Sequence, residues 1–120
     1  MAVTRFENLE VWQEAVSLAV EVYAVSKSGG FTQDFGLRDQ VQRAAVSIAS
    51  NIAEGKERET IAECIRYLYI AKGSSGELKT QLIIAQRIGY IEEECTHSLI
   101  RRVEQVSAKL GALIRTLKRK

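Results

Sequence analysis

The sequence contains no proline, two cysteines, one histidine and no apolar run close to the roughly 20 residues that cross a bilayer. Without proline, nothing interrupts a long helix. Eight glycines in 120 residues are too few for an all-β domain, which needs turn residues about every 8 to 12 positions. These shortages argue against a membrane-spanning protein and against an all-β fold, and they favour helices.

The residues that are present describe a soluble globular chain. Hydrophobic residues make up 46% of the sequence and charged residues 27%, a balance that differs from that of disordered chains. A chain of 120 residues supports one core, so we expect a single domain over residues 1–120. The net charge of +2 is too small to indicate nucleic acid or an anionic membrane as a partner.

Cysteine use and the N-terminus bear on the compartment. Cys64 and Cys95 fit no CxxC pattern, and each lies within a run of helical periodicity. We interpret both as small core residues in a reducing compartment rather than as a disulfide. The opening MAVTRFENLE lacks the apolar core of a secretion signal. We therefore expect a cytoplasmic protein without a membrane partner.

Hydrophobic periodicity predicts four helices. The first begins near Asn8, a good helix cap, and ends before Gly29 and Gly30. Its main stripe is expected to be Trp12, Ala15, Val16, Ala19, Val22 and Tyr23, widened by a second stripe of Val11, Leu18 and Val25. The second helix is expected over about residues 34–54, with Gly55 as its stop.

The third and fourth helices have clearer starts. Thr60-x-x-Glu63 is a capping box, and the apolar residues that follow it keep a helical spacing as far as Gly89. The fourth helix has acidic residues in its first turn and basic residues in its last, the order that a helix dipole favours. Its predicted heptad seam is Leu99, Val103, Val106, Leu110, Leu113 and Leu117. Four amphipathic helices with short connections predict an all-α fold, an antiparallel up-and-down four-helix bundle.

Two glycines stand inside the third predicted helix, in Gly73-Ser74-Ser75-Gly76. The two glycines lower the stability of the helix by about 2 kcal/mol relative to alanine. We therefore expect a structural or functional reason for glycine at these positions. The ordinary explanation is close approach by a neighbouring helix or a bend, and the alternative is a hinge or binding notch. A phosphate-binding loop is not indicated because no strand precedes the segment and no Lys-Ser/Thr pair follows it.

The second helix is apolar around more than half of its circumference, whereas packing against a single bundle core buries only about 100° of the circumference of a helix. The surplus arc favours self-association, although small alanines exposed on a good helix are the alternative. A narrow polar stripe runs opposite the core. Together the arc and the polar stripe supply the predicted subunit-interface residues, Gln40, Arg43, Val46, Ser47, Ala49, Ser50, Asn51, Ala53 and Glu54.

The segment RAAVSIASNIAEG, at residues 43–55, resembles the hallmark of a bacterial family of small four-helix bundles, the 23S rRNA-intervening-sequence proteins. The blocks FENLEVWQEA, FGLRDQ, IRYLYIAKGSSGELKTQL and IGYI resemble the remaining family blocks in order, over nearly the whole chain. The resemblance implies a ring-like homopentamer. It also implies kinship with accessory proteins of diversity-generating retroelements, which are basic pentamers that bind a reverse transcriptase and nucleic acid.

The resemblance does not assign an activity, because the rRNA in the family name records gene location rather than chemistry. One position departs from the family pattern: Ala49 stands where proline is common. Since proline kinks helices, we expect a straighter second helix in this chain.

Residues 97–120 hold seven Lys or Arg against the single Glu104, which concentrates positive charge at one end of the chain. These cations are the candidate phosphate contacts, although a solvated outer face is the alternative and the segment lacks aromatic residues for base stacking. Repetition of the patch around an oligomer would strengthen weak, sequence-nonspecific RNA or DNA binding. The candidates are Arg101, Arg102, Lys109, Arg115, Arg119 and Lys120.

Two other functions compete with nucleic-acid binding. Glu94-x-x-His97 has the spacing of di-iron carboxylate bundles, but one such motif is too few for that centre. Neither cysteine has an evident catalytic base, so we expect no enzyme, metal or cofactor. The runner-up is a protein-interaction scaffold without nucleic acid, in which the polar stripe of the second helix makes the contacts.

Overall fold

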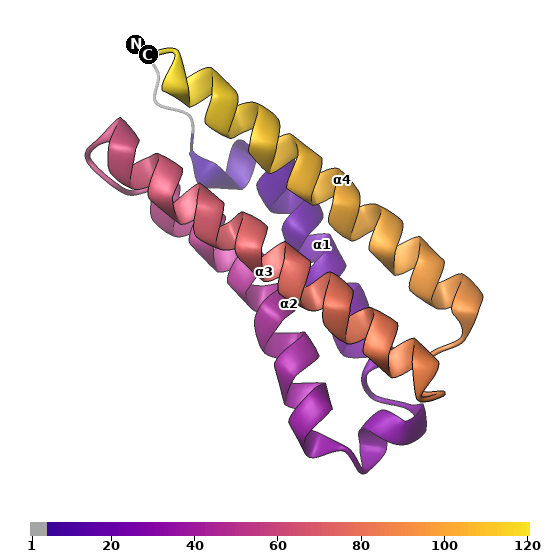
Figure 1. The fold of residues 1–120 in the computed structure, drawn as a ribbon. Helices are drawn as coiled ribbons and strands as arrows, with labels where there is room; N and C mark the ends of the chain where they lie inside the picture. The colour runs from indigo at the N-terminus through magenta and orange to yellow at the C-terminus, as the bar shows by residue number, and fades with distance from the viewer. Residues whose placement is uncertain (1–4) are drawn as a thin grey trace.

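The computed structural model describes residues 5–120, which form four α-helices and two short 3-10 helices (Figure 1). In chain order these elements are η1 (Phe6–Asn8), α1 (Glu10–Val25), η2 (Gly29–Thr32), α2 (Phe35–Lys56), α3 (Ile61–Arg87) and α4 (Glu93–Lys118). The helices contact one another in the cyclic order α1, α2, α3, α4, while the backbones of diagonal pairs stay farther apart. The molecule measures 49 × 20 × 19 Å. The predicted antiparallel up-and-down bundle is confirmed.

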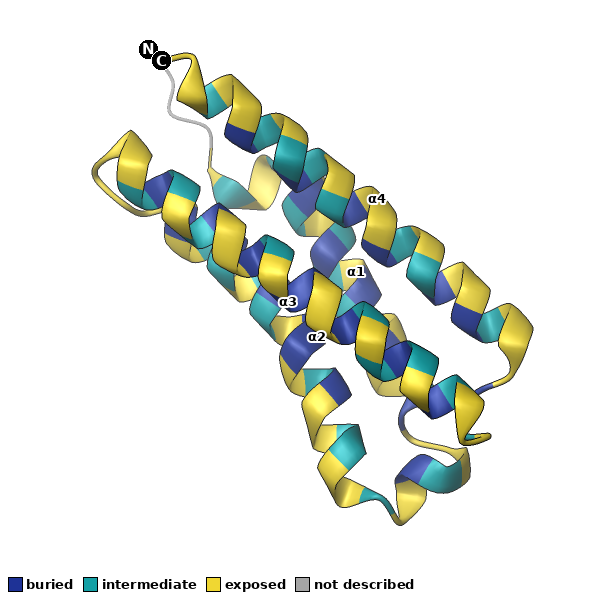
Figure 2. Cartoon of the chain, viewed as in Figure 1, coloured by how far each residue is buried: buried dark blue, intermediate teal, exposed yellow. Residues whose placement is uncertain are grey.

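The core is built from one buried stripe per helix, and Figure 2 shows these stripes turned inward. In α4 the predicted heptad seam is buried from Leu99 to Leu110, but Ile114 then replaces Leu113 as the buried residue. Because a straight α-helix has 3.6 residues per turn, a strict seven-residue repeat drifts off the core face over several turns. Leu113 and Leu117 consequently pack only partly against the core.

The prediction for α1 was wrong in two respects. Asn8 belongs to η1, and Leu9 occupies the N-cap position without a side-chain cap. The buried stripe is Val11, Ala15, Leu18 and Val22. Of the stripe expected to be central, Ala15 and Val22 are buried, whereas the other residues are only partly buried or, at Tyr23, exposed. Both stripes are apolar, so periodicity alone could not decide which of them faces the bundle axis.

The start of α2 is tied to the connection between α3 and α4. Asp34 Oδ1 accepts a hydrogen bond from the Leu37 amide at 3.0 Å, and Tyr90 Oη donates to Asp34 Oδ2 at 2.9 Å. The hydrogen bond from the Leu37 amide is the largest cause that lowers the pKa of Asp34, and the hydrogen bond from Tyr90 lowers it further. The Tyr90 ring also covers the Gly30 Cα so closely that a Cβ there would lie 2.0 Å from it. This junction therefore requires glycine at position 30.

Gly55 does not end α2, which continues to Lys56. Gly55 is buried, and a Cβ there would lie 3.1 Å from the Cys64 carbonyl oxygen and 3.2 Å from Tyr67 Cβ. Its role is to let α2 approach α3, rather than to supply a left-handed turn. The helix is unbroken at Ala49, and Figure 1 shows its N-terminal part leaning away from the direction of the rest. A curve is therefore present without a proline.

The ends of α3 follow the prediction. Thr60 Oγ1 accepts a hydrogen bond from the Glu63 amide at 3.1 Å. Gly89 has φ +87°, and the Tyr90 amide donates to the Ala85 carbonyl at 2.8 Å, which closes the helix with a Schellman turn. Close approach does not explain Gly73 and Gly76, because a Cβ at either glycine would meet no atom within 4 Å.

Candidate nucleic-acid and self-assembly surfaces

The structure divides the six predicted phosphate contacts into two groups. Lys109 forms ion pairs with Glu10 and Glu14 of α1, and Arg102 donates a hydrogen bond to Ser17 Oγ of α1 at 2.9 Å. The hydrogen bond with Glu10 is the largest cause that raises the pKa of Lys109, and it lowers the pKa of Glu10. These two cations join α4 to α1, and the charge of Lys109 is already compensated within the chain.

The other four candidates, Arg101, Arg115, Arg119 and Lys120, are exposed and take part in no ion pair within residues 5–120. Arg115 lies on the side of α4 that faces α3. A Cβ at Gly111 would lie 3.5 Å from Arg115 Nη1 and 3.4 Å from Lys72 Cε of α3. The absence of a side chain at Gly111 therefore lets an α4 cation and an α3 cation come close together.

An aromatic residue of α3 completes this surface. Lys118 Nζ donates a hydrogen bond to Tyr69 Oη at 2.9 Å and lies 5.2 Å from the centroid of the ring. Tyr69 is 48% exposed. The sequence interpretation missed it because it searched for aromatic residues within the fourth helix alone, whereas the antiparallel α3–α4 pair brings position 69 beside position 118. We call Tyr69, Lys72, Arg115 and Lys118 the basic seam.

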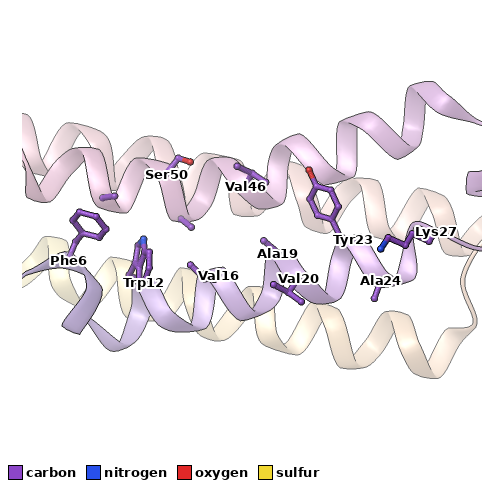
Figure 3. Close-up of a pocket in the computed structure, with 12 residues that line it drawn as sticks. Phe6, Trp12, Val16, Ala19, Val20, Tyr23, Ala24, Lys27, Val46 and Ser50 are labelled. Carbon is purple, nitrogen blue, oxygen red and sulfur yellow. The ribbon is translucent and has the colours of Figure 1, made fainter.

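Four of the predicted interface residues, Val46, Ala49, Ser50 and Ala53, face α1 across an apolar groove of about 710 Å³ (Figure 3). The α1 wall includes four of the six residues that were expected to be in the core, namely Trp12, Val16, Ala19 and Tyr23. Figure 3 shows the Trp12 ring standing in the groove beside Phe6, with Tyr23 toward the other end. The α1/α2 groove is lined by Phe6, Trp12, Val16, Ala19, Val20, Tyr23, Ala24, Lys27, Val46, Ala49, Ser50 and Ala53.

The polar stripe of α2 is largely engaged inside the chain. The Ser47 and Ser74 hydroxyls are 2.9 Å apart, and Asn51 Nδ2 donates to Ser47 Oγ at 2.9 Å. Glu54 pairs with Arg58. The structure thus supplies a third explanation besides an interface and a solvated face, since Ser47 joins α2 to α3 and Asn51 supports Ser47 from within α2. The remaining two residues, Gln40 and Arg43, line a smaller polar groove of about 460 Å³ with Glu77 and Gln81 of α3.

The described residues show no arrangement for metal chemistry. His97 is exposed near the start of α4, and its Nε2 lies 3.9 Å from Glu93 Oε1, one turn earlier. No group of three or more potential metal ligands gathers anywhere in residues 5–120. Cys64 and Cys95 are free thiols, and burial raises the pKa of both. Among the helices described, none has the length and apolar character needed to cross a membrane.

Comparison with solved structures gives an independent view of the fold. The chain is similar to a crystal structure of a protein of unknown function from the S23 ribosomal protein family of Bacteroides thetaiotaomicron. The two chains are 24% identical, the match covers 87% of this chain and 97% of the other, and the TM-score is 0.78. Among curated proteins, none matches this chain significantly.

The family comparison agrees with the sequence blocks. The model of the 23S rRNA-intervening sequence protein family matches residues 7–112, which span all of α1, α2 and α3 and most of α4. This chain therefore belongs to the 23S rRNA-intervening sequence protein family.

Proposed function

We propose that this protein is a non-enzymatic bundle that assembles with itself and binds RNA or DNA weakly, without sequence preference. The basic seam carries the nucleic-acid part of the proposal. In it, Lys72, Arg115 and Lys118 have no carboxylate partner within the described chain, and Lys118 contacts the exposed ring of Tyr69. Cations that track a phosphate backbone beside a ring that can stack on a base are the components of nonspecific single-strand binding.

The size of the seam explains why assembly matters. Arg115 and Lys118 are about 4.5 Å apart along the α4 axis, so a single copy offers a short track for two or three phosphates. Several copies in one assembly would repeat the seam and raise the effective concentration of each additional contact. The homopentamer implied by the family resemblance is the assembly that we expect.

Titration of fluorescent single-stranded RNA and DNA at several salt concentrations tests the proposal. We expect affinity to fall steeply as salt rises, with similar slopes for unrelated sequences. Arg115→Glu should weaken binding to every sequence and reduce the salt slope by about 1 per lost phosphate contact. The oligomer mass should stay that of the wild type.

Lys56→Glu is the matched control because it makes the same charge change on an exposed residue at the end of α2, a helix that contributes no residue to the seam. It should weaken binding much less than Arg115→Glu. Equal losses in both variants would show that net charge, and not the seam, governs binding. No binding by the wild-type oligomer at low salt would overturn the nucleic-acid proposal.

The α1/α2 groove favours a second candidate, a scaffold that binds proteins and no nucleic acid. Its wall is apolar over most of its length and holds Trp12 and Tyr23, residue types enriched at protein interfaces. Oligomers that form without any affinity for nucleic acid at low salt would support this candidate over the first.

A further inference from the structure

Within residues 5–120, two apolar surfaces are exposed on a single copy. The first is the α1/α2 groove. The second lies on α3, where Ile70, Ile84 and Ile88 are 41%, 46% and 52% exposed. At 100° per residue these three residues lie with Gly73 and Glu77 within an arc of about 60°. We call these five residues the α3 ridge.

The ridge and the groove have matching dimensions. Ile70 and Ile84 are about 21 Å apart along the axis of α3. The α1 residues of the groove run about 18 Å from Trp12 to Ala24, and Phe6 and Lys27 line the groove beyond these two residues. Gly73 leaves the middle of the ridge bare, since a Cβ there would meet nothing within 4 Å. A helix that is bare at this point can approach the floor of a groove closely. This approach would give the exposed glycine a purpose that packing inside one chain does not provide.

The polar groups of the two surfaces are also compatible. Glu77 is the one charged residue of the ridge, and it is exposed. The groove is lined by the Lys27 ammonium and the hydroxyls of Tyr23 and Ser50, all of which can donate hydrogen bonds to a carboxylate. The rest of each surface is mainly hydrocarbon, so docking would remove apolar area from water on both sides.

We infer that the α3 ridge of one copy docks in the α1/α2 groove of the next, so that the chain is its own partner in a head-to-tail contact. This inference rests on the self-assembly proposed above and names the surfaces that produce it. The two surfaces lie on neighbouring sides of the bundle with α2 between them, because Ser74 and Glu77 place the ridge side of α3 next to α2. Copies joined in this way turn progressively and can close into a ring, whereas identical surfaces would pair as a two-fold dimer.

Two surface substitutions test the inference in the full chain. Val20→Glu places a charge in the groove, where Val20 is 64% exposed, and Ile84→Glu places one on the ridge. Each variant alone should sediment as a monomer of 13.4 kDa at concentrations where the wild type is oligomeric. Ile61→Glu is the matched control, because Ile61 is 44% exposed on the same helix but lies on the side opposite the ridge. It should keep the wild-type mass.

Mixing the two monomeric variants gives the decisive measurement. The Val20→Glu chain keeps an intact ridge and the Ile84→Glu chain keeps an intact groove, so the mixture should form a one-to-one dimer and nothing larger. Circular dichroism checks that each variant keeps its helices. If either glutamate unfolds the chain, Val46→Ser in the groove and Ile88→Ser on the ridge repeat the test with smaller changes.

The possible failures are distinguishable. A monomeric wild type would overturn the proposed self-assembly itself. An oligomeric Ile84→Glu variant, or folded variants that stay monomeric when mixed, would overturn the head-to-tail contact and leave self-assembly standing. If Ile84→Glu is oligomeric while Val20→Glu is monomeric, association uses the groove without the ridge. The groove would then pair with the groove of another copy or hold another occupant.

Discussion

At the scale of single residues, glycines that look alike in the sequence have opposite surroundings. Gly55 is buried where the backbones of α2 and α3 come close, and its position is limited by the Cys64 carbonyl oxygen. Gly76 lies in the middle of α3 with open space around the place of a Cβ. Because glycine is a poor helix former in both places, what differs is the cost of adding a methyl group.

Gly55→Ala and Gly76→Ala should therefore change stability in opposite directions. Gly55→Ala should lower the free energy of unfolding by about 1 to 2 kcal/mol, because overpacking at rigid backbone exceeds the gain in helix propensity. Gly76→Ala should raise it by up to about 1 kcal/mol. Urea denaturation followed by circular dichroism measures both. A stabilised Gly55→Ala protein would mean that α2 and α3 can separate at little cost.

At the scale of elements, α4 is held to its two neighbours differently. It packs extensively along α3, while its contact with α1 is the smallest between neighbouring helices. Lys109 bridges this α1–α4 contact by pairing with Glu10 and Glu14. Glu14 Oε2 is buried and has no hydrogen-bond partner among the described residues. Loss of Lys109 would therefore leave the Glu14 carboxylate partly buried without any compensating charge.

Lys109→Met should loosen α1 more than the other helices. Hydrogen exchange should become faster at the amides of α1, while the α2–α3 pair changes little. Arg101→Met removes an unpaired α4 cation and is the control that should leave exchange in α1 unchanged. Lys109→Met should also keep the salt slope of nucleic-acid binding, since Lys109 faces α1 and lies outside the basic seam. Uniform acceleration over all four helices would show that the bundle opens as one unit.

At the scale of the whole molecule, the bundle has a closed core and two apolar surfaces outside it. The core buries one stripe from each helix, but the second apolar stripe of α1 is only partly buried against it and the outer isoleucines of α3 are exposed. Burial of these surfaces between copies would couple folding to association, so the stability of the protein would depend on its concentration.

The melting temperature should accordingly rise by about 3 to 5 °C for each tenfold increase in protein concentration, if dissociation accompanies unfolding. Val20→Glu, which blocks the groove, should remove this dependence. Differential scanning calorimetry over two decades of concentration measures the effect. A melting temperature that is constant for the wild type would indicate that assembly does not contribute to stability.

The amino-acid sequence by itself determined the four helices, their antiparallel order, the Thr60 cap and the end of the third helix before Gly89. These features depend on local signals, namely periodicity and residues with strong preferences at helix ends, that can be read without knowing what packs nearby. The family followed from the same local blocks.

The tertiary structure decided which of two apolar stripes of α1 faces the core. It also decided that Gly55 lets α2 pack closely on α3, and that carboxylates of α1 balance the charge of Lys109. It also placed Tyr69 beside Lys118. Each of these outcomes depends on contacts between residues distant in the chain, which no local pattern encodes. The surfaces proposed for binding and assembly are therefore products of helix packing, although every residue in them belongs to a helix that the sequence predicts.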